Sequence, residues 1–245
     1  RINSSPSNLN STFSLSFLTG IIFLMDLRQF RERCHICFFW KQNCYCRHIK
    51  AFDPKIKFVI LIQYREARKH IATGRLSHLC LKNSELIIGY NYTHDARVNE
   101  ILADPSLFPM VLYPGKQATN LTQSNSTLWT ESVPKNKTPV IFVIDGTWTN
   151  ARKTMQRSLN LQQLPQICFD PPHPSKFRLR KQPEEFCFST VEAIHHTIEL
   201  IGPHVQFDVA SRTHDHLLNV FDLMMDKQIE HMKHLPRFSP ARIEL

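Results

Sequence analysis

Asp145 stands where an apolar segment of the chain turns polar. Five consecutive apolar residues, Val140–Ile144, precede it, and Gly146, Thr147 and Trp148 follow it. Such a run is typical of a strand buried on both faces, which is commonest in parallel α/β sheets. Ligands collect at the carboxyl ends of these strands and at the helix N-termini just beyond them. A carboxylate here can accept a proton in a reaction, or it can simply bind the first N–H groups of the next helix.

The residues after Asp145 predict the helix that would position it. Gly146 permits a tight turn, and Thr147 has the side chain of an N-cap. Ala151, Met155 and Leu159 then recur at helical spacing, so we expect them on one face of the helix.

Four cysteines form a second candidate site near the start of the chain. Cys34 and Cys37 make a C-x2-C pair, and Cys44 and Cys46 make a C-x-C pair. Four thiolates complete a tetrahedral structural zinc site and leave no open position for chemistry. The second pair is tighter than usual zinc spacing, so the pattern also allows a redox role. The other three of the seven cysteines are scattered, which favours a metal site over a disulfide framework and a reducing cytoplasm over a secreted location.

The charge balance indicates an anionic partner. The chain has 30 Lys and Arg against 21 Asp and Glu, a formal net charge of +9, as suits a protein that meets nucleic acid or a membrane surface. Aromatic residues interleave with the first cysteines, namely Phe38, Phe39, Trp40 and Tyr45. Their rings could stack on unpaired RNA bases, or they could form the small core of a zinc knuckle.

At 245 residues the chain is long enough for one α/β domain with an appendage. We expect residues 1–24 to be a disordered or non-native extension, residues 25–52 a basic zinc knuckle, and residues 53–245 the catalytic domain. The apolar run at 13–24 is too short for a transmembrane helix, so no membrane association is expected. Neither the spacing nor the composition predicts an oligomeric state.

Periodicity predicts a mostly parallel sheet with flanking helices. Besides 140–144, strands are expected at 56–62, 86–89, 108–112 and 167–169. Helices are expected at 73–81, 95–102, 147–159 and 189–201. An amphipathic region follows at 208–234, and we expect its histidines to lie on the solvated surface. The segments 117–137 and 170–174 are expected to be loops. No G-x-G-x-x-G segment is present, which argues against a Rossmann cofactor site.

Asp-Gly-Thr-Trp at 145–148 resembles the D-x-T-W signature of the DTW-domain family, and further segments match that family in the same order. Besides the cysteines, these are Thr73-Gly74-Arg75-Leu76, Leu112-Tyr113-Pro114, Phe177–Pro183 and Ser189–Ala193. The resemblance spans roughly residues 30 to 200, and several ordered matches are more specific than one tetrapeptide. It implies a tRNA-uridine aminocarboxypropyltransferase, which moves the 3-amino-3-carboxypropyl group of S-adenosylmethionine to uridine N3. It also implies a fold similar to the knotted SPOUT methyltransferases.

The resemblance further implies roles for individual residues. Asp145 becomes the candidate catalytic base, and the four cysteines become ligands of a structural zinc. Arg178 and Arg180 would contact RNA or the carboxylate of the cofactor, although alternating arginines of an edge strand can also just face water. The residues expected at the S-adenosylmethionine site are Leu112, Tyr113, Pro114, Gly146, Thr147, Trp148, Thr190 and Glu192.

Two observations keep alternatives open. Glu192 can equally complement the dipole of its own helix. Tyr64-Arg65-Glu66-Ala67 stands where the family commonly has His-Pro-x-Glu, so only the Glu is retained and Glu66 becomes the next candidate base. The rival functions are a SPOUT-type RNA methyltransferase, which uses the same cofactor, and a non-catalytic zinc-bearing RNA-binding protein.

Overall fold

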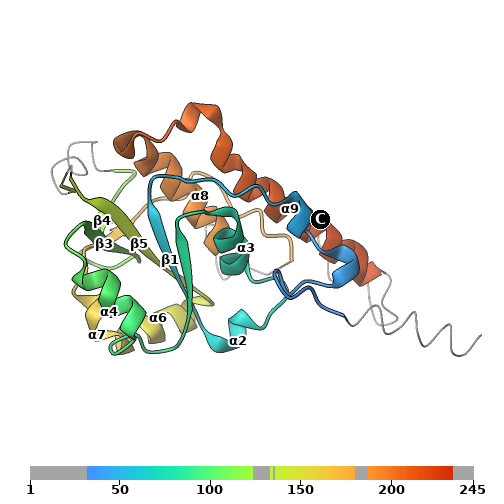
Figure 1. Ribbon diagram of the computed structural model, residues 1–245, viewed down its shortest axis with the longest axis horizontal. Helices are drawn as coiled ribbons and strands as arrows, with labels where there is room; N and C mark the ends of the chain where they lie inside the picture. Colours follow the sequence, from blue (N-terminus) through green and yellow to red (C-terminus); the bar gives the residue numbers. More distant parts are fainter. Residues whose placement is uncertain (1–31, 124–132, 135, 180–186, 234–245) are drawn as a thin grey trace, which may run out of the picture.

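A six-stranded parallel sheet forms the centre of the computed structural model, which describes residues 32–123, 133–134, 136–179 and 187–233 (Figure 1). The strand order is β2-β1-β5-β3-β6-β4, and every pairing between neighbours is parallel. The strands are β1 (Lys57–Ile62), β2 (Ser84–Ile88), β3 (Leu107–Leu112), β4 (Thr119–Asn120), β5 (Thr138–Asp145) and β6 (Gln166–Cys168). The predicted α/β architecture is confirmed.

Helices cover both faces of the sheet (Figure 1). On one face, α3 (Thr73–Cys80) packs against α8 (Thr190–Ile201) and α9 (His216–Lys233). The other face carries α4 (Ala96–Ala103), α6 (Trp148–Arg157) and α7 (Leu159–Gln162). The short helix α2 (Tyr64–Ala67) follows β1. Single turns of 3-10 helix are η1 (Lys41–Asn43), η2 (Cys46–His48), η3 (Gly202–Val205), η4 (Val209–Ser211) and η5 (Thr213–Asp215).

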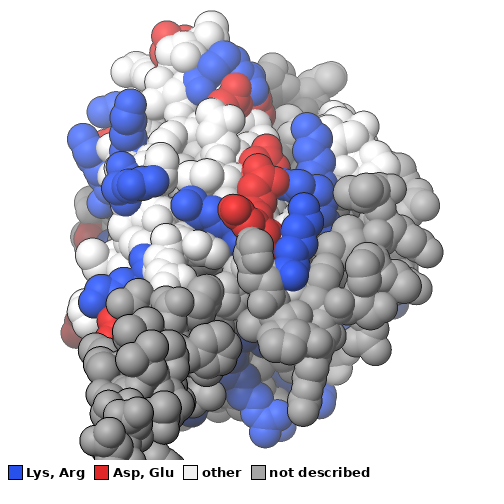
Figure 2. Space-filling view, turned by 90° about the vertical axis from the view of Figure 1, so that its right-hand side faces the viewer, with Lys and Arg blue, Asp and Glu red and all other residues white. Residues whose placement is uncertain are grey.

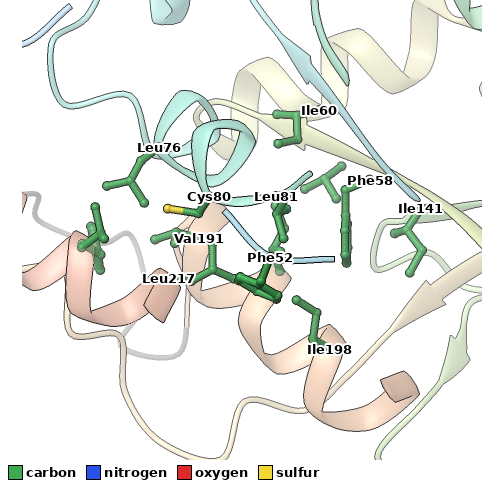
Figure 3. Packing of buried hydrophobic residues seen from close by; sticks show 14 of the residues in the cluster. Phe52, Phe58, Ile60, Leu76, Cys80, Leu81, Ile141, Val191, Ile198 and Leu217 are labelled. Atoms are coloured by element: carbon green, nitrogen blue, oxygen red, sulfur yellow. The ribbon is translucent and has the colours of Figure 1, made fainter. Parts of the chain in front are cut away.

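The continuous apolar runs of the central strands are explained by burial on both faces. In β1, Phe58 and Ile60 belong to the core beneath α3 and α8, whereas Val59 and Leu61 belong to the core beneath α4 and α6. Figure 3 shows Phe58 and Ile60 pointing toward this first core, which also holds Leu76 of α3. Because successive strand residues point to opposite faces, a strand covered on both sides must be apolar throughout.

The predicted strands and the four predicted helices are present with shifts of one or two residues at their ends. The amphipathic region at 208–234 consists of η4, η5 and α9, which begins at His216. The expected loop at 117–137 contains β4, a two-residue strand. Leu159 was expected on the same helix face as Ala151 and Met155, but it lies outside α6 and is 58% exposed. The helix ends at Arg157, and Ser158 leaves the helical conformation while its Oγ accepts a hydrogen bond from the Tyr92 backbone N–H. Ala151 and Met155 are buried.

The expectation that the histidines of 208–234 lie on the surface is also wrong for two of them. His214 is fully buried, and its Nε2 lies 2.9 Å from Glu199 Oε1. His231 is 7% exposed, and its ring stacks on Trp40 with 5.1 Å between the ring centroids. In both cases the partner comes from another element, which the local pattern of residues 208–234 does not reveal.

No helix among the described residues has the length and apolar character needed to cross a membrane. The predicted extension at 1–24 lies outside the described residues, as does Arg180.

Candidate active site at the carboxyl edge of the sheet

Asp145 is the last residue of β5 and lies beside Ile62, the last residue of β1. Its side chain is only 6% exposed. Gly146 follows with a backbone φ of 157°, which side-chain-bearing residues rarely adopt, so the chain can turn sharply toward α6. The predicted N-cap is confirmed, because Thr147 Oγ1 accepts a hydrogen bond from the Asn150 N–H at 3.3 Å.

The Asp145 carboxylate joins the first residues of two other helices. Thr190 Oγ1, at the start of α8, donates to Asp145 Oδ1 at 2.5 Å, and Thr73 Oγ1, at the start of α3, donates to the same oxygen at 3.5 Å. Gly74 packs so closely that a Cβ there would lie 2.8 Å from Asp145 Oδ2. The positive ends of helix dipoles favour a negative charge at such a position. Three of the matched segments therefore meet at one buried carboxylate.

Glu192 secures the start of α8 to a distant loop. Its carboxylate accepts hydrogen bonds from the N–H and Oγ of Ser189, at 2.8 and 2.6 Å, in a capping box. It also accepts from Ser175 Oγ at 2.8 Å and from the Lys176 N–H at 2.7 Å. With four donors and 4% exposure, Glu192 positions the 175–176 loop. The expected contact between Glu192 and the cofactor stays a prediction. For this contact, the cofactor must replace one of the four hydrogen-bond donors.

Most of the other expected cofactor residues lie at, or just beyond, the carboxyl ends of the neighbouring strands β3 and β5. Leu112 of β3 pairs with Val143 of β5, so the loop that begins at Tyr113 and Pro114 leaves the sheet on the same edge as Asp145. Trp148 opens α6, is 44% exposed, and donates from Nε1 to Cys187 Sγ at 3.1 Å. The parallel pairing thus brings the ends of β3 and β5 to one edge of the sheet.

Arg178 has a partner within the chain. It lies in a turn rather than an edge strand, and its guanidinium donates to Asp226 of α9 at 2.7 Å. Both side chains are substantially exposed, at 42% and 64%, so this ion pair contributes little to stability. Contact with RNA or cofactor stays a prediction, and it requires Arg178 to exchange partners.

Two groups of residues at this edge were not predicted to belong to the site. Thr73 and Gly74 were noted as a motif but were given no place at the site; their membership of an ordered motif was the available signal. The second group is the exposed, basic surface of α2 and the residues after it, hereafter the α2 surface. It consists of Tyr64, Arg65, Arg68 and Lys69, all exposed.

The α2 surface adjoins the Asp145 site. It follows the carboxyl end of β1, whose last residue pairs with Asp145. A Cβ at Gly146 would lie 3.8 Å from Glu66 Cγ, so α2 packs beside the residue after Asp145. Tyr64 is 64% exposed, and the Arg68 guanidinium lies 5.3 Å from its ring centroid. An exposed ring and several cations therefore lie next to the buried carboxylate.

The four cysteines have the arrangement that a tetrahedral metal requires. Sγ of Cys34 lies 3.7 Å from that of Cys46, and Sγ of Cys37 lies 3.7 Å from that of Cys44. All four sulfurs lie within 4.8 Å of one another. Zinc–sulfur bonds of about 2.3 Å place tetrahedral sulfurs about 3.8 Å apart. The cluster could therefore hold zinc. By contrast, burial raises the pKa of the Cys80 thiol to about 12, as expected for an inert core cysteine.

The aromatic residues of the cysteine segment differ in exposure. Phe39 and Tyr45 are fully buried and belong to the same core cluster as α3, α8 and α9. Phe38 is 41% exposed, and the guanidinium of the buried Arg75 lies 4.2 Å from its ring centroid. Asn43 also donates to the Lys227 carbonyl of α9 at 3.1 Å. The cysteine segment thus packs on α9 and shares a core with α3 and α8, whose first residues contact Asp145.

Comparison with known proteins identifies the family. The model of the DTW domain matches residues 31–229. A relative from Drosophila melanogaster, named tRNA-uridine aminocarboxypropyltransferase 2, is 26% identical over 170 residues, covering 66% of this chain and 63% of the relative. A protein of the same name from Macaca fascicularis is 25% identical over 166 residues, covering 66% of this chain and 54% of the relative.

The chain therefore spans less than two thirds of the length of each of these relatives. No solved structure gave a significant match. Because the domain model covers most of the chain, and because its matched segments meet at Asp145, this protein belongs to the DTW-domain family.

Proposed function

We propose that this protein transfers the 3-amino-3-carboxypropyl group of S-adenosylmethionine to N3 of a uridine in tRNA. The observation that carries the proposal is the buried Asp145 carboxylate, on which the starts of α3 and α8 converge. The names of the two relatives supply the substrate class. They are longer proteins, so the complete activity of this chain is an inference from the part they share.

The reaction requires the removal of one proton. A bond forms between uridine N3 and the γ-carbon of the transferred group, the bond from that carbon to sulfur breaks, and 5'-methylthioadenosine leaves. The N3 proton must go to a base, and Asp145 is our candidate. Oδ1 already accepts from Thr190 and Thr73, and Oδ2 faces Gly74. In this role, the uridine N3–H must replace one of these contacts.

Glu66 is the alternative proton acceptor. It lies beside Gly146, its side chain is 12% exposed, and its carboxylate pairs with Lys69 at 2.8 Å. As a base it must give up this ion pair, which is partly exposed and therefore inexpensive to break.

S-adenosylmethionine would supply an activated carbon beside its sulfonium. The residues at the ends of β3 and β5 fit such a ligand, because Trp148 exposes an aromatic surface and the backbone of Tyr113–Pro114 leaves the sheet on the same edge. We propose that Leu112–Pro114 and Gly146–Trp148 orient the cofactor so that its γ-carbon, rather than its methyl group, faces uridine N3.

We propose that the α2 surface contacts the tRNA. Cations neutralise phosphates, and an exposed ring such as that of Tyr64 can stack on an unpaired base. The net charge alone does not locate this contact. Figure 2 shows Lys and Arg side chains in separate groups on one face, with a strip of Asp and Glu side chains between them. Proximity to Asp145 is therefore the argument for α2.

Three further proposals follow from the family. The four-cysteine cluster would hold a structural zinc, because its sulfur spacing matches that metal. The chain at the carboxyl edge of the sheet would be threaded into a knot, as in SPOUT proteins. A tRNA substrate and a cluster of cysteines without disulfides both fit a cytoplasmic location.

Mass spectrometry of nucleosides tests the function. Purified protein is incubated with S-adenosylmethionine and tRNA that lacks the modification, and the tRNA is then digested to nucleosides. We expect a uridine that carries an aminocarboxypropyl group. A methylated nucleoside would instead identify an RNA methyltransferase. Unchanged nucleosides, from protein that binds the same tRNA, would identify a non-catalytic RNA-binding protein.

A further inference from the structure

A second group of metal-binding side chains lies away from the cysteines. His195 and Glu199 are one turn apart on α8, and His214 and Asp215 belong to η5, the turn that precedes α9. One ligand atom from each of the four lies within 4.8 Å of all the others. We propose that these four residues form a second divalent metal site, of the two-histidine, two-carboxylate type that suits zinc.

The distances between the ligand atoms match a tetrahedral ion. His195 Nε2 lies 2.8 Å from Asp215 Oδ1 and 3.9 Å from Glu199 Oε1. His214 Nε2 lies 2.9 Å from Glu199 Oε1 and 3.9 Å from Asp215 Oδ1. Zinc bonds of about 2.0–2.1 Å to nitrogen and oxygen place tetrahedral ligands about 3.3–3.4 Å apart. The observed distances bracket this value, so small side-chain movements would admit the ion.

Both histidines are shielded from solvent. His214 is fully buried and His195 is 8% exposed. Burial lowers the pKa of His195, which favours the neutral imidazole with a lone pair to donate. The centroids of the two rings lie 4.8 Å apart, with an angle of 31° between the ring planes.

Arg212 sets the charge of the group. Its guanidinium contacts Glu199 Oε1 and Asp215 Oδ1, each at 2.6 Å. It also donates from Nε to Asp215 Oδ2 at 2.9 Å. One guanidinium offsets only one of the two carboxylates, so the group keeps a net negative charge when both histidines are neutral. Asp215 can give Oδ1 to a metal and retain Arg212 on Oδ2.

The group is accessible from a cavity. A cavity of about 360 Å³ is lined by His195, Glu199 and Arg212, and also by Glu192 from the start of α8. An ion in this cavity can therefore reach two of the four ligands, His195 and Glu199, directly. Because four protein ligands fill a tetrahedral site, the metal would be structural. It would join α8, which carries Thr190 and Glu192 at its other end, to the turn before α9.

Cobalt(II) titration distinguishes this site from the cysteine site. Cobalt bound by thiolates shows intense sulfur-to-metal charge-transfer absorption, whereas cobalt bound by imidazole and carboxylate shows only weak ligand-field bands. We expect the metal-free full chain to bind two equivalents, of which one lacks charge-transfer absorption. Glu199→Gln and His214→Gln should each bind one equivalent with the charge-transfer band intact. His94→Gln, at an exposed histidine outside the group, should still bind two.

The same preparations separate metal loss from misfolding. Glu199→Gln keeps a side-chain oxygen for His214 and nearly the same shape. Its cobalt stoichiometry therefore tests the site even if His214→Gln fails to fold. Zinc should raise the Tm of the wild-type chain more than that of Glu199→Gln. The proposal would be overturned if the folded wild-type chain bound a single equivalent of cobalt, with only thiolate charge-transfer absorption. The four residues would then form only a hydrogen-bonded cluster between α8 and η5.

Discussion

Gly74 and Asp145 approach so closely that position 74 has no room for a larger residue. A Cβ at Gly74 would lie 2.8 Å from both Cγ and Oδ2 of Asp145. The contact joins the start of α3 to the end of β5, 71 positions along the chain by their numbers. It explains physically why a Thr-Gly-Arg segment and the D-x-T-W segment occur in one protein.

Gly74→Ala should therefore damage the site as well as the fold. Overpacking of this kind costs about 1–3 kcal/mol of unfolding free energy, and here the carboxylate itself must move. Gly202→Ala is a matched control, because its Cβ would lie 2.8 Å from Val209 Cγ1 at the opposite end of α8. We expect a similar fall in Tm for both variants, with turnover lost only in Gly74→Ala when both are assayed well below their Tm. Equal turnover would contradict the assigned role of this contact.

Asp145→Asn tests the proposed base. The amide keeps an oxygen that can accept from Thr190 but cannot take up the N3 proton, so turnover should fall by about 100-fold or more. Affinity for S-adenosylmethionine should change little. Thr190→Val provides the comparison, because it removes the hydroxyl from the same contact and leaves the carboxylate. If both variants lose turnover to the same small extent, Asp145 only anchors α8, and Glu66 becomes the candidate base.

Cys44→Ala should weaken metal binding by the cysteine cluster. Loss of one thiolate leaves an incomplete tetrahedron, so the charge-transfer absorption of the cobalt-loaded protein should decrease and zinc should be lost more readily to a chelator. Cys168→Ala, in β6 and outside the cluster, should leave both properties unchanged. A Cys44→Ala protein that binds cobalt with wild-type absorption and affinity would rule out Cys44 as a ligand.

Arg65→Ala should weaken tRNA binding without changing the chemistry of the site. Loss of one phosphate contact lowers the affinity for tRNA and reduces the slope of log affinity against log salt by about one. Lys82→Ala is the control, because Lys82 is exposed and precedes β2 at the opposite edge of the sheet. Binding curves at several salt concentrations distinguish the two variants. Identical slopes for Arg65→Ala and the wild-type chain would place the tRNA elsewhere.

The features predictable from sequence were those that one segment encodes by itself. The apolar runs of β1 and β5 indicated buried parallel strands, because a strand covered on both faces needs apolar residues at nearly every position. Thr147 was recognisable as an N-cap, and the close spacing of the four cysteines indicated a metal site before any fold was known.

The features that escaped prediction depend on partners far along the chain. The burial of His214 depends on Glu199, a residue of a different helix. The partner of Arg178 lies 48 residues away in α9. The Thr73 contact with Asp145 spans 72 residues. Local periodicity carries no information about such pairs, because the fold rather than the segment decides which side chains meet.

The identity of the sulfur-containing product is the most direct test of the proposed reaction. The wild-type chain is incubated with S-adenosylmethionine and unmodified tRNA, and the small molecules are separated and quantified. Aminocarboxypropyl transfer predicts 5'-methylthioadenosine in amounts equal to the modified uridine, with formation dependent on tRNA and lost in Asp145→Asn. S-adenosylhomocysteine in its place would contradict the account, because it would show that the methyl group had been transferred.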